Sequence, residues 1–582
     1  MKKEKNKGIT LIALVITIIV LLILAGVTIA SITGENGILE KATEAREKTK
    51  KSEQEEMSDL DNVLNLINNS APSTDGYNES KKVNSPKISQ GMIPIKWNGE
   101  NWMVCDNKDT EWYSYENKNW ANIMLNDGKY KSDTVKVGQI VKDDELGSMY
   151  VWIPRYAYTV DKDNQKMNVT FIKGNTNEGT NGEVYTTDEG VDTTSTKLVH
   201  PGFNFGGTAL TGIWVAKFEA SGTDKNGNAV GNAKEGITDY NNVVQQYEPD
   251  ETTIAKSLPN KISWRHITIG ECEKRSMNIA TIDKDKFGIK NVNSHLIKNS
   301  EWGAVAYLCY SQYGNIPKIN GAGKLSLNPW YACDMYTGQG PKEELSDDNY
   351  NKENDNYNYN TINGQLASTN GNITGIYDMN GGAWEVVAGF LDNNNGNLNN
   401  NGKSNDGMIK YFENGTLNAK YLNMWNSYEV SNEEKENKIK IDDNSTITQI
   451  SLWNNSKTEE KYQIARKRLT EYIYLKMGNH NGIGINEVNL LGESFHAPFK
   501  NSEGKISWGW FKTTEEPTKE SGANQQYGRA WDSDGTLIGH ASLPFILRGG
   551  NCGSKKMAGI LCSSATGGNA ENSVGFRATL IL

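Results

Sequence analysis

The apolar residues divide this chain into a membrane-type segment, a polar helix and a long β-rich remainder. Residues from Ile9 to Ile32 carry no charge and are almost entirely apolar. A helix over this run, rising about 1.5 Å per residue, is long enough to span a hydrocarbon core of about 30 Å. We therefore predict a leader and transmembrane helix within residues 1–33. Four lysines before Gly8 predict a single-pass protein of the cell membrane with the bulk of the chain extracellular.

Residues 34–70 are predicted to form a charged helical stalk. Glu44 precedes Lys48 by four residues, which is the orientation that supports a helix. Apolar residues between Met57 and Ile67 recur at intervals of three or four and form one stripe. The stripe either packs on the domain that follows or packs against a partner helix, and both interpretations are open. Residues 71–90 have no periodicity and are rich in Ser, Asn and Pro, so we predict a flexible linker.

Residues 91–145 are predicted to form a small aromatic β module. Apolar side chains alternate from Ile93 to Trp97 and again from Trp102 to Val104, and Asn98-Gly99 lies between the two runs. This pattern is typical of a β-hairpin. The many Trp and Tyr residues of the module form its core or stack on sugars, and the first interpretation is the more common for such a module.

The end of the chain alternates in the same way around a run of small polar residues. Phe545 and Leu547 predict a strand before the Gly549-Gly550 turn, and the alternation from Phe576 to Leu580 predicts another. Between them lie Asn, Ser, Thr, Lys and a single carboxylate, Glu571, so the segment has no acid–base pair of its own. We expect a solvent-facing loop on a rigid frame, suited to contact rather than to catalysis.

Composition excludes several classes of function. The 582-residue chain has a net charge of −10 and no basic stripe, which argues against nucleic acid as a partner. The six histidines and six cysteines show no metal-ligand spacing, so we predict no metal site and no cofactor. The Asp/Asn runs, such as the one from Asp392, leave two interpretations open: a structural calcium site, or solvated turns.

Several motifs, taken in order, resemble the formylglycine-generating-enzyme domain, a variant of the C-type-lectin fold. They are MYVWIPRYAY from Met149, HPGFNFGG from His200, GIWVAKFEA from Gly212, SHLIKNSEWGAVAYL from Ser294, GIYDMNGGAWEVVAGF from Gly375, and the ending RGGN…AGI…VGFRA. The ending looks most like that of variable proteins diversified by retroelements. The resemblance implies an α+β chain in which residues 146–582 form a C-type-lectin-fold ligand-binding domain, with long Asn-rich insertions at about 220–260, 340–370 and 391–480.

The catalytic branch of that family carries a copper-binding cysteine pair a few residues after its RGG turn. Here Cys552 follows the turn at once and the next cysteine is Cys562, so the spacing differs and we predict no enzyme activity. Outside the cell these two cysteines either form a disulfide over the loop or remain separate thiols. The family's other motif positions imply structural roles, which fall here on Trp384, Glu385, Arg548, Gly549, Gly550, Gly575, Phe576 and Arg577.

The N-terminus resembles a type IV prepilin leader, cleaved between Gly8 and Ile9. The resemblance implies a prepilin peptidase and other pilin-like subunits as partners. Ala13 stands where such leaders have glutamate at the fifth mature position, which weakens the expectation of filament assembly. A plain signal anchor is the alternative.

Together these features predict a membrane-anchored, pilin-like extracellular ligand-binding protein of the adhesin or receptor type. Its ligand is an extracellular protein or glycan of unknown identity. A formylglycine-generating-type oxidase acting on cysteine peptides and a structural minor pilin are the alternatives. The expected ligand-contacting residues are Asn551, Cys552, Ser554, Lys555, Lys556, Ser563, Ser564, Thr566, Asn569, Glu571 and Asn572.

Overall fold

The computed structural model describes most residues from 72 to 392 and most residues from 545 to 582, with shorter pieces between these two parts. The described ranges are 72–161, 164–188, 191, 193–223, 252–315, 336–340, 358–392, 412–413, 416–417, 420–426, 438–440, 446–448, 494–500, 506–512, 528–529, 534–536, 545–551, 554 and 558–582. The predicted leader, transmembrane helix and stalk, residues 1–70, lie outside them, as does most of the three predicted insertions. Among the helices within the described ranges, none combines the length and apolarity needed to cross a bilayer.

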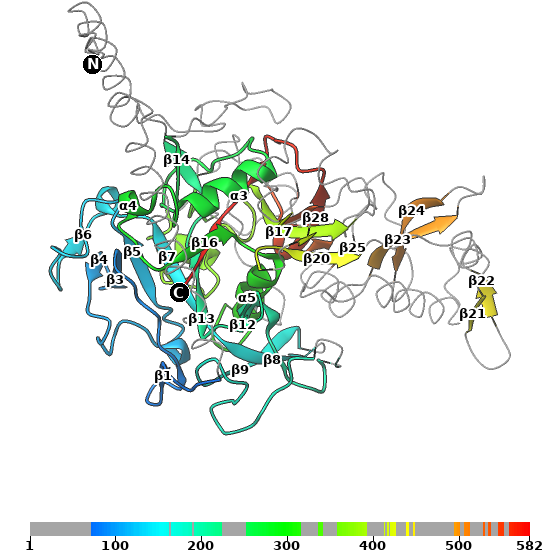
Figure 1. The fold of residues 1–582 in the computed structure, drawn as a ribbon, viewed down its shortest axis with the longest axis horizontal. Helices are drawn as coiled ribbons and strands as arrows, with labels where there is room; N and C mark the ends of the chain where they lie inside the picture. The colour runs from blue at the N-terminus through cyan, green and yellow to red at the C-terminus, as the bar shows by residue number, and fades with distance from the viewer. Residues whose placement is uncertain are drawn as a thin grey trace, which may run out of the picture. The chain divides into compact units, whose positions relative to one another are not determined.

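An eight-stranded sheet contains strands from both ends of the described chain (Figure 1). Its order is β16 (Asn293–Leu296), β30 (Ala578–Ile581), β13 (Gly212–Ala216), β7 (Met149–Pro154), β5 (Asn122–Leu125), β3 (Met92–Trp97), β4 (Trp102–Val104) and β6 (Ile140–Val141). All the pairings are antiparallel. The last strand of the chain therefore lies between β16 and β13, far from its neighbours in sequence.

A second sheet carries the motifs of the C-terminal half. Its order is β20 (Asn423–Asn426), β17 (Trp384–Asp392), β27 (Phe545–Gly549), β28 (Gly559–Thr566), β26 (Gly535–Thr536) and β25 (Gly528–Arg529), with β29 (Val574–Gly575) paired beside β17. β17 is parallel to β20 and β29 and antiparallel to β27.

Smaller elements complete the described structure. A three-stranded sheet has the order β10 (Leu198–Val199), β8 (Tyr156–Asp161), β9 (Lys166–Phe171). Two-stranded pairs are β1 (Tyr77–Asn78) with β2 (Val83–Asn84), β11 (Asn204–Phe205) with β12 (Thr208–Ala209), β14 (Ser221–Thr223) with β15 (Ile254–Lys256), β18 (Phe412–Glu413) with β19 (Thr416–Leu417), β21 (Lys438–Lys440) with β22 (Thr446–Thr448), and β23 (Ser494–Lys500) with β24 (Ile506–Lys512). The helices are α3 (Ile269–Asn278), α4 (Lys284–Phe287) and α5 (Asn299–Cys309), and the 3₁₀ turns are η1 (Tyr115–Asn117), η2 (Asp143–Glu145), η3 (Pro201–Phe203) and η4 (Gly364–Ala367).

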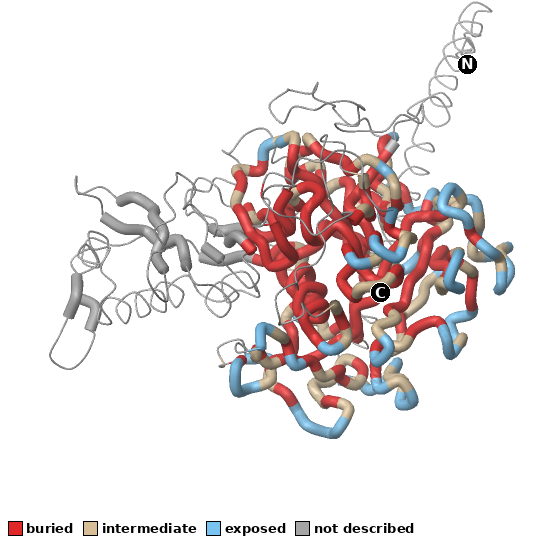
Figure 2. The backbone as a smooth tube through the Cα atoms, turned by 180° about the vertical axis from the view of Figure 1, so that it is seen from behind, coloured by how far each residue is buried: buried red, intermediate tan, exposed pale blue. Residues whose placement is uncertain are grey.

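Helix α5 lies in the core between these sheets. Every one of its residues is buried, and it contacts β17, β28 and β9. The Glu301 side chain accepts a hydrogen bond from the Lys298 backbone at 2.9 Å, which closes a capping box at the start of the helix. Helix α3 packs on β16 and starts at Thr268, whose hydroxyl accepts from the Glu271 backbone N–H. Buried residues gather around these elements, and exposed residues lie mainly on the connecting loops (Figure 2).

The hairpin predicted in the aromatic segment is confirmed. Trp97 pairs with Trp102, and the Asn98 side chain accepts from the backbone N–H groups of Glu100 and Asn101 within the turn. The prediction of a separate module at residues 91–145 is wrong, because β5 pairs with β7 and makes these strands half of the eight-stranded sheet. The segment's aromatic side chains form core, as the first interpretation held: Trp102, Trp112, Tyr113, Tyr115 and Trp120 are all buried.

The prediction of a flexible linker is also wrong for residues 72–90. Val83 and Asn84 are fully buried. The Asn84 amide donates to the carbonyls of Gly174 and Thr211 at 2.8 and 2.9 Å and accepts from the Gly174 N–H at 2.7 Å. A side chain that satisfies three buried backbone groups fixes the segment, although its composition is that of a linker.

We predict that Asn84→Ala destabilises the protein by about 3 kcal/mol, because it leaves buried backbone groups without partners. Urea unfolding followed by tryptophan fluorescence measures the change. Asn107→Ala, on an exposed turn, is the matched control and should stay within about 0.5 kcal/mol of the wild type. Equal midpoints for the two variants would show that the 72–90 segment is not part of the cooperative core.

Candidate functional site

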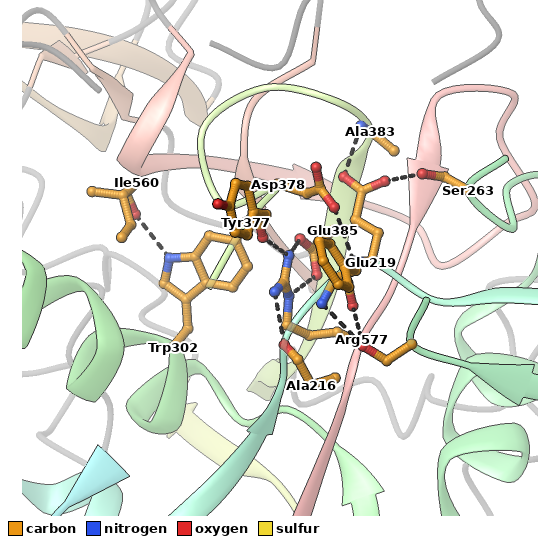
Figure 3. Close-up of polar contacts among 12 residues, drawn as sticks. Ala216, Glu219, Ser263, Trp302, Tyr377, Asp378, Ala383, Glu385, Ile560 and Arg577 are labelled. Carbon is orange, nitrogen blue, oxygen red and sulfur yellow. Dashed lines mark hydrogen bonds and ion pairs between the residues drawn. The ribbon is translucent and has the colours of Figure 1, made fainter. Parts of the chain in front are cut away.

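The last strand is anchored by a buried ion pair between Arg577 and Glu385 (Figure 3). The guanidinium contacts both carboxylate oxygens, with Nε donating to Oε2 at 2.6 Å. Arg577 also donates to the backbone carbonyls of Ala216 at 3.1 Å and Tyr377 at 3.0 Å. Neither charged side chain is exposed to solvent. The pair therefore joins β17 of the second sheet to β13 and the start of β30 in the first.

Two further carboxylates lie beside this pair. Glu219 is fully buried and accepts from the Ala383 N–H at 2.9 Å, while its other oxygen is hydrogen-bonded to the Ser263 hydroxyl. Asp378 accepts from the backbone N–H groups of Gly338 at 2.8 Å and Glu219 at 3.3 Å. Glu219 thus bridges the Ser263 and Ala383 segments directly (Figure 3).

Burial sets the charge state of this cluster. Burial raises the pKa of Glu219 well above its ordinary value, and the nearby carboxylates Asp378 and Glu385 raise it further. Burial also raises the pKa of Glu385 to about 7, against the opposing attraction of Arg577. Burial lowers the pKa of Arg577, but its attraction to Glu385 outweighs this, so the pKa is raised overall. The raised pKa values of Glu219 and Glu385 both follow mainly from the burial of charged groups away from water.

Trp302 of α5 supports the same frame. Its indole N–H donates to the Ile560 carbonyl at 2.8 Å (Figure 3), and the guanidinium carbons of Arg577 and Arg548 lie 5.7 and 6.0 Å from its ring. The turn after Arg548 uses Gly549 and Gly550 at φ of 87° and 77°, and a Cβ on Gly550 would meet the Ala558 backbone at 2.6 Å. The positions assigned structural roles are buried, except that Trp384 is half-buried: Glu385, Arg548, Gly549, Gly550, Gly575, Phe576 and Arg577.

The expected display surface is only partly exposed. The expectation that its side chains face solvent is wrong for those that pack inward: Asn551, Ser554, Ser563, Ser564 and Thr566. Asn569 and Glu571 are exposed and Asn572 is half-buried. Cys552, Lys555 and Lys556 lie outside the described residues.

The reason for this burial is a strand where the sequence predicted a loop. Residues Gly559–Thr566 form β28, which pairs with β27 on one side and β26 on the other, so it is an interior strand of its sheet. Asn551 and Ser554 instead close a turn on each other, because the Asn551 side chain accepts from both the N–H and the hydroxyl of Ser554 at 3.1 Å. Small polar residues are compatible with both an interior strand and a tight turn. Their composition alone is also that of an open loop, which is what the sequence predicted.

The exposed residues belong to a short segment, Gly567 to Ser573, which we call the terminal loop. Three of its carbonyls accept from backbone N–H groups elsewhere in the chain: Gly568 from Ile269 at 3.2 Å, Glu571 from His266 at 3.1 Å, and Ser573 from Trp384 at 2.8 Å. The Thr566 hydroxyl donates to a Glu571 carboxylate oxygen at 2.8 Å. The loop is therefore fixed at its base while its outer side chains face solvent.

Sequence reasoning missed the residues that hold this loop, Arg265 and His266. Arg265 is buried and donates to the Asn572 carbonyl at 3.1 Å. His266 is half-buried, and its ring Nδ1 lies 2.8 Å from the Asn572 side-chain oxygen. His266 has a φ of 56°, a left-handed conformation that is uncommon for a residue other than glycine. No motif in the sequence marks it, because the contact spans some 300 residues of chain.

No group of three or more His, Cys, Asp or Glu side chains is placed to hold a metal ion in the described part of the chain. Cys562 is buried in β28, and Cys552 lies outside the described residues, so the alternative of a disulfide between them stays open. Comparison of the chain with protein-family models and with curated proteins gave no match in either case.

We predict that Arg577→Leu destabilises the protein by about 3–5 kcal/mol, because it leaves Glu385 buried without its cation. The double variant Arg577→Leu with Glu385→Leu should lose less than the single variant, since both buried charges of the pair are removed. Urea unfolding of both variants measures the difference. Additive losses in the double variant would contradict the direct pairing.

We predict that the ionisation of Glu219 makes the free energy of unfolding depend on pH. Because the pKa of Glu219 is raised in the folded state, its contribution is full below the unfolded pKa of about 4.5 and is lost as pH rises towards the folded pKa. Glu219→Gln does not ionise; its oxygen can still accept from Ala383, and its NH2 group can donate to the Ser263 hydroxyl. The stability of this variant relative to wild type should therefore grow with pH by at most about 1.4 kcal/mol per unit. Free energies of unfolding measured across this pH range should separate for Glu219→Gln and wild type, and parallel profiles would contradict the prediction. The control is Glu100→Gln, at an exposed position, whose profile should run parallel to that of the wild type.

Proposed function

We propose that this chain is a membrane-anchored, pilin-like extracellular protein that binds ligands through a variable C-terminal surface. The apolar segment within residues 1–33 is its anchor, and residues 146–582 are its ligand-binding domain of C-type-lectin type, diversified by a retroelement. The ligand is an extracellular protein or glycan. We assign no catalytic step to the chain.

One observation carries this proposal: the exposed side chains of the terminal loop stand on a buried frame. The frame residues Arg577, Glu385 and Trp302 are fully buried, whereas Asn569 and Glu571 are exposed. Substitutions at exposed positions usually change stability by no more than about 0.5 kcal/mol, so the loop's outer residues can vary without unfolding the frame. This separation suits a surface whose specificity changes while its fold does not.

Burial narrows the proposed set of ligand-contacting residues. We retain Asn569, Glu571 and Asn572 of the terminal loop, together with Cys552, Lys555 and Lys556. We exclude Asn551, Ser554, Ser563, Ser564 and Thr566, because their side chains are buried. Their replacement costs packing and hydrogen bonds rather than altering contact with a ligand.

A library of the full-length chain, displayed on cells and randomised at Asn569, Glu571 and Asn572, tests the proposal. Selection on panels of purified extracellular proteins and of immobilised glycans should yield variants with new binding partners and unfolding midpoints close to wild type. A control library randomised at Ser563, Ser564 and Thr566 should instead lose folded protein, because these side chains are buried.

Three outcomes would contradict the proposal. The first is a terminal-loop library from which no binder emerges. The second is incorporation of the wild-type chain into filaments with no ligand bound by its C-terminal face, which would favour the minor pilin. The third is copper-dependent oxidation of a cysteine peptide by the purified chain, which would favour the oxidase.

A further inference from the structure

The outer face of the terminal loop presents hydrogen-bond acceptors in fixed positions. Glu571 is the only carboxylate between Asn551 and Ser573. One of its oxygens accepts from Thr566, and its backbone carbonyl accepts from the N–H groups of His266 and Val574, both at 3.1 Å. The backbone and the carboxylate group of Glu571 are thus both held in place by hydrogen bonds. Among the described residues, Glu571 makes no ion pair, although its side chain is exposed.

His266 contacts the same loop, because its backbone N–H donates to the Glu571 carbonyl and its ring contacts the Asn572 side chain. With the Asn572 side-chain oxygen as its partner, ring Nδ1 carries the proton and donates it at 2.8 Å. In the neutral ring, Nε2 is then an acceptor. No hydrogen bond to Nε2 is found among the described residues, and the ring is half-buried. Asn569, exposed in the same loop, offers a third acceptor through its amide oxygen.

The local backbone is arranged to hold the imidazole in this place. His266 has a φ of 56°, a left-handed conformation that is strained for a residue other than glycine. Arg265 before it is tied to the Asn572 carbonyl, and Ser263 is tied to the buried Glu219. The segment carrying His266 is therefore fixed both to the terminal loop and to the interior.

We propose that His266 and Glu571 together bind a cationic side chain, the ammonium of a lysine or the guanidinium of an arginine, on an extracellular protein partner. This inference rests on the proposed function and names the partner's chemistry at that surface. A fixed carboxylate with a neighbouring neutral acceptor matches a group that has several N–H donors and a positive charge. Because the acceptors are already held in place, little ordering is needed on binding. His266 is then a constant specificity residue, supplied from outside the variable C-terminal stretch.

The test measures binding of short peptides to the full-length chain in a non-ionic detergent by biolayer interferometry. The probes are an N-acetylated peptide with alternating Gly and Arg, its Gly and Lys counterpart, and a Gly and Glu peptide of the same length. The wild type should bind the two cationic peptides and not the acidic one. Glu571→Gln should weaken that binding at least tenfold, because the charge is lost while the hydrogen bond from Thr566 is kept.

His266→Gly should weaken peptide binding three- to tenfold without loss of stability, since glycine adopts the left-handed conformation freely. Lys118→Gly is the matched control: Lys118 has the same φ of 56° and the same partial burial, and it lies at the end of η1. This control should leave peptide binding unchanged. Unfolding midpoints of all three variants show whether each one is folded.

Several results would overturn the inference. One is equal binding of the acidic and cationic peptides, or no binding of either cationic peptide by the wild type. Another is unchanged binding by folded Glu571→Gln and His266→Gly variants. In that case the proposed function would still stand if the terminal-loop library yields binders, because that selection does not depend on a cationic ligand.

Discussion

The buried contact between Arg577 and Glu385 is the interaction on which the described structure depends. It joins the two large sheets at the point where the last strand enters the first sheet. A buried ion pair adds little stability over an apolar pair of the same shape, because desolvation offsets the attraction. The importance of the pair is geometric. The Arg577 guanidinium donates to carbonyl and carboxylate partners in fixed directions, and these bonds form together only when β13, β17 and β30 have one particular arrangement.

The same constraint explains why the terminal loop can be exposed and yet fixed. The loop lies between β28 and β29, just before the anchored Arg577, and its carbonyls are held by His266, Ile269 and Trp384. Glu219 bridges the two segments that supply Arg265, His266 and Trp384, since it is bonded to Ser263 and to Ala383. A surface held in this way can change its side chains with little change in its backbone. This suits the proposed recognition by residue substitution better than recognition by loop movement.

The sequence predicted the elements that depend on local pattern and missed those that depend on distant partners. The hairpin at Asn98 and the strands at Phe545 and Leu580 were predictable, because alternation and turn residues are local properties. The fixed conformation around Asn84 was not predictable, because its side chain is bonded to three backbone groups of the distant residues Gly174 and Thr211. Strand β28 was missed for a related reason: Ser563, Ser564 and Thr566 are polar, and only pairing on both sides makes such residues part of a sheet interior.

The burial of these hydroxyls also limits which residues near the end of the chain we propose as variable. A buried Ser or Thr in an interior strand tolerates few replacements, because a larger side chain must displace its neighbours and a charged one must be desolvated. Exposed Asn569 and Glu571 carry neither restriction. Among the described residues of this stretch, the positions that we propose to vary without cost to the fold are therefore those at the outer edge of the terminal loop. The recognition that we propose over so small an area needs constant residues around it. We propose His266 as one of them, because its ring contacts Asn572 and its backbone N–H donates to Glu571.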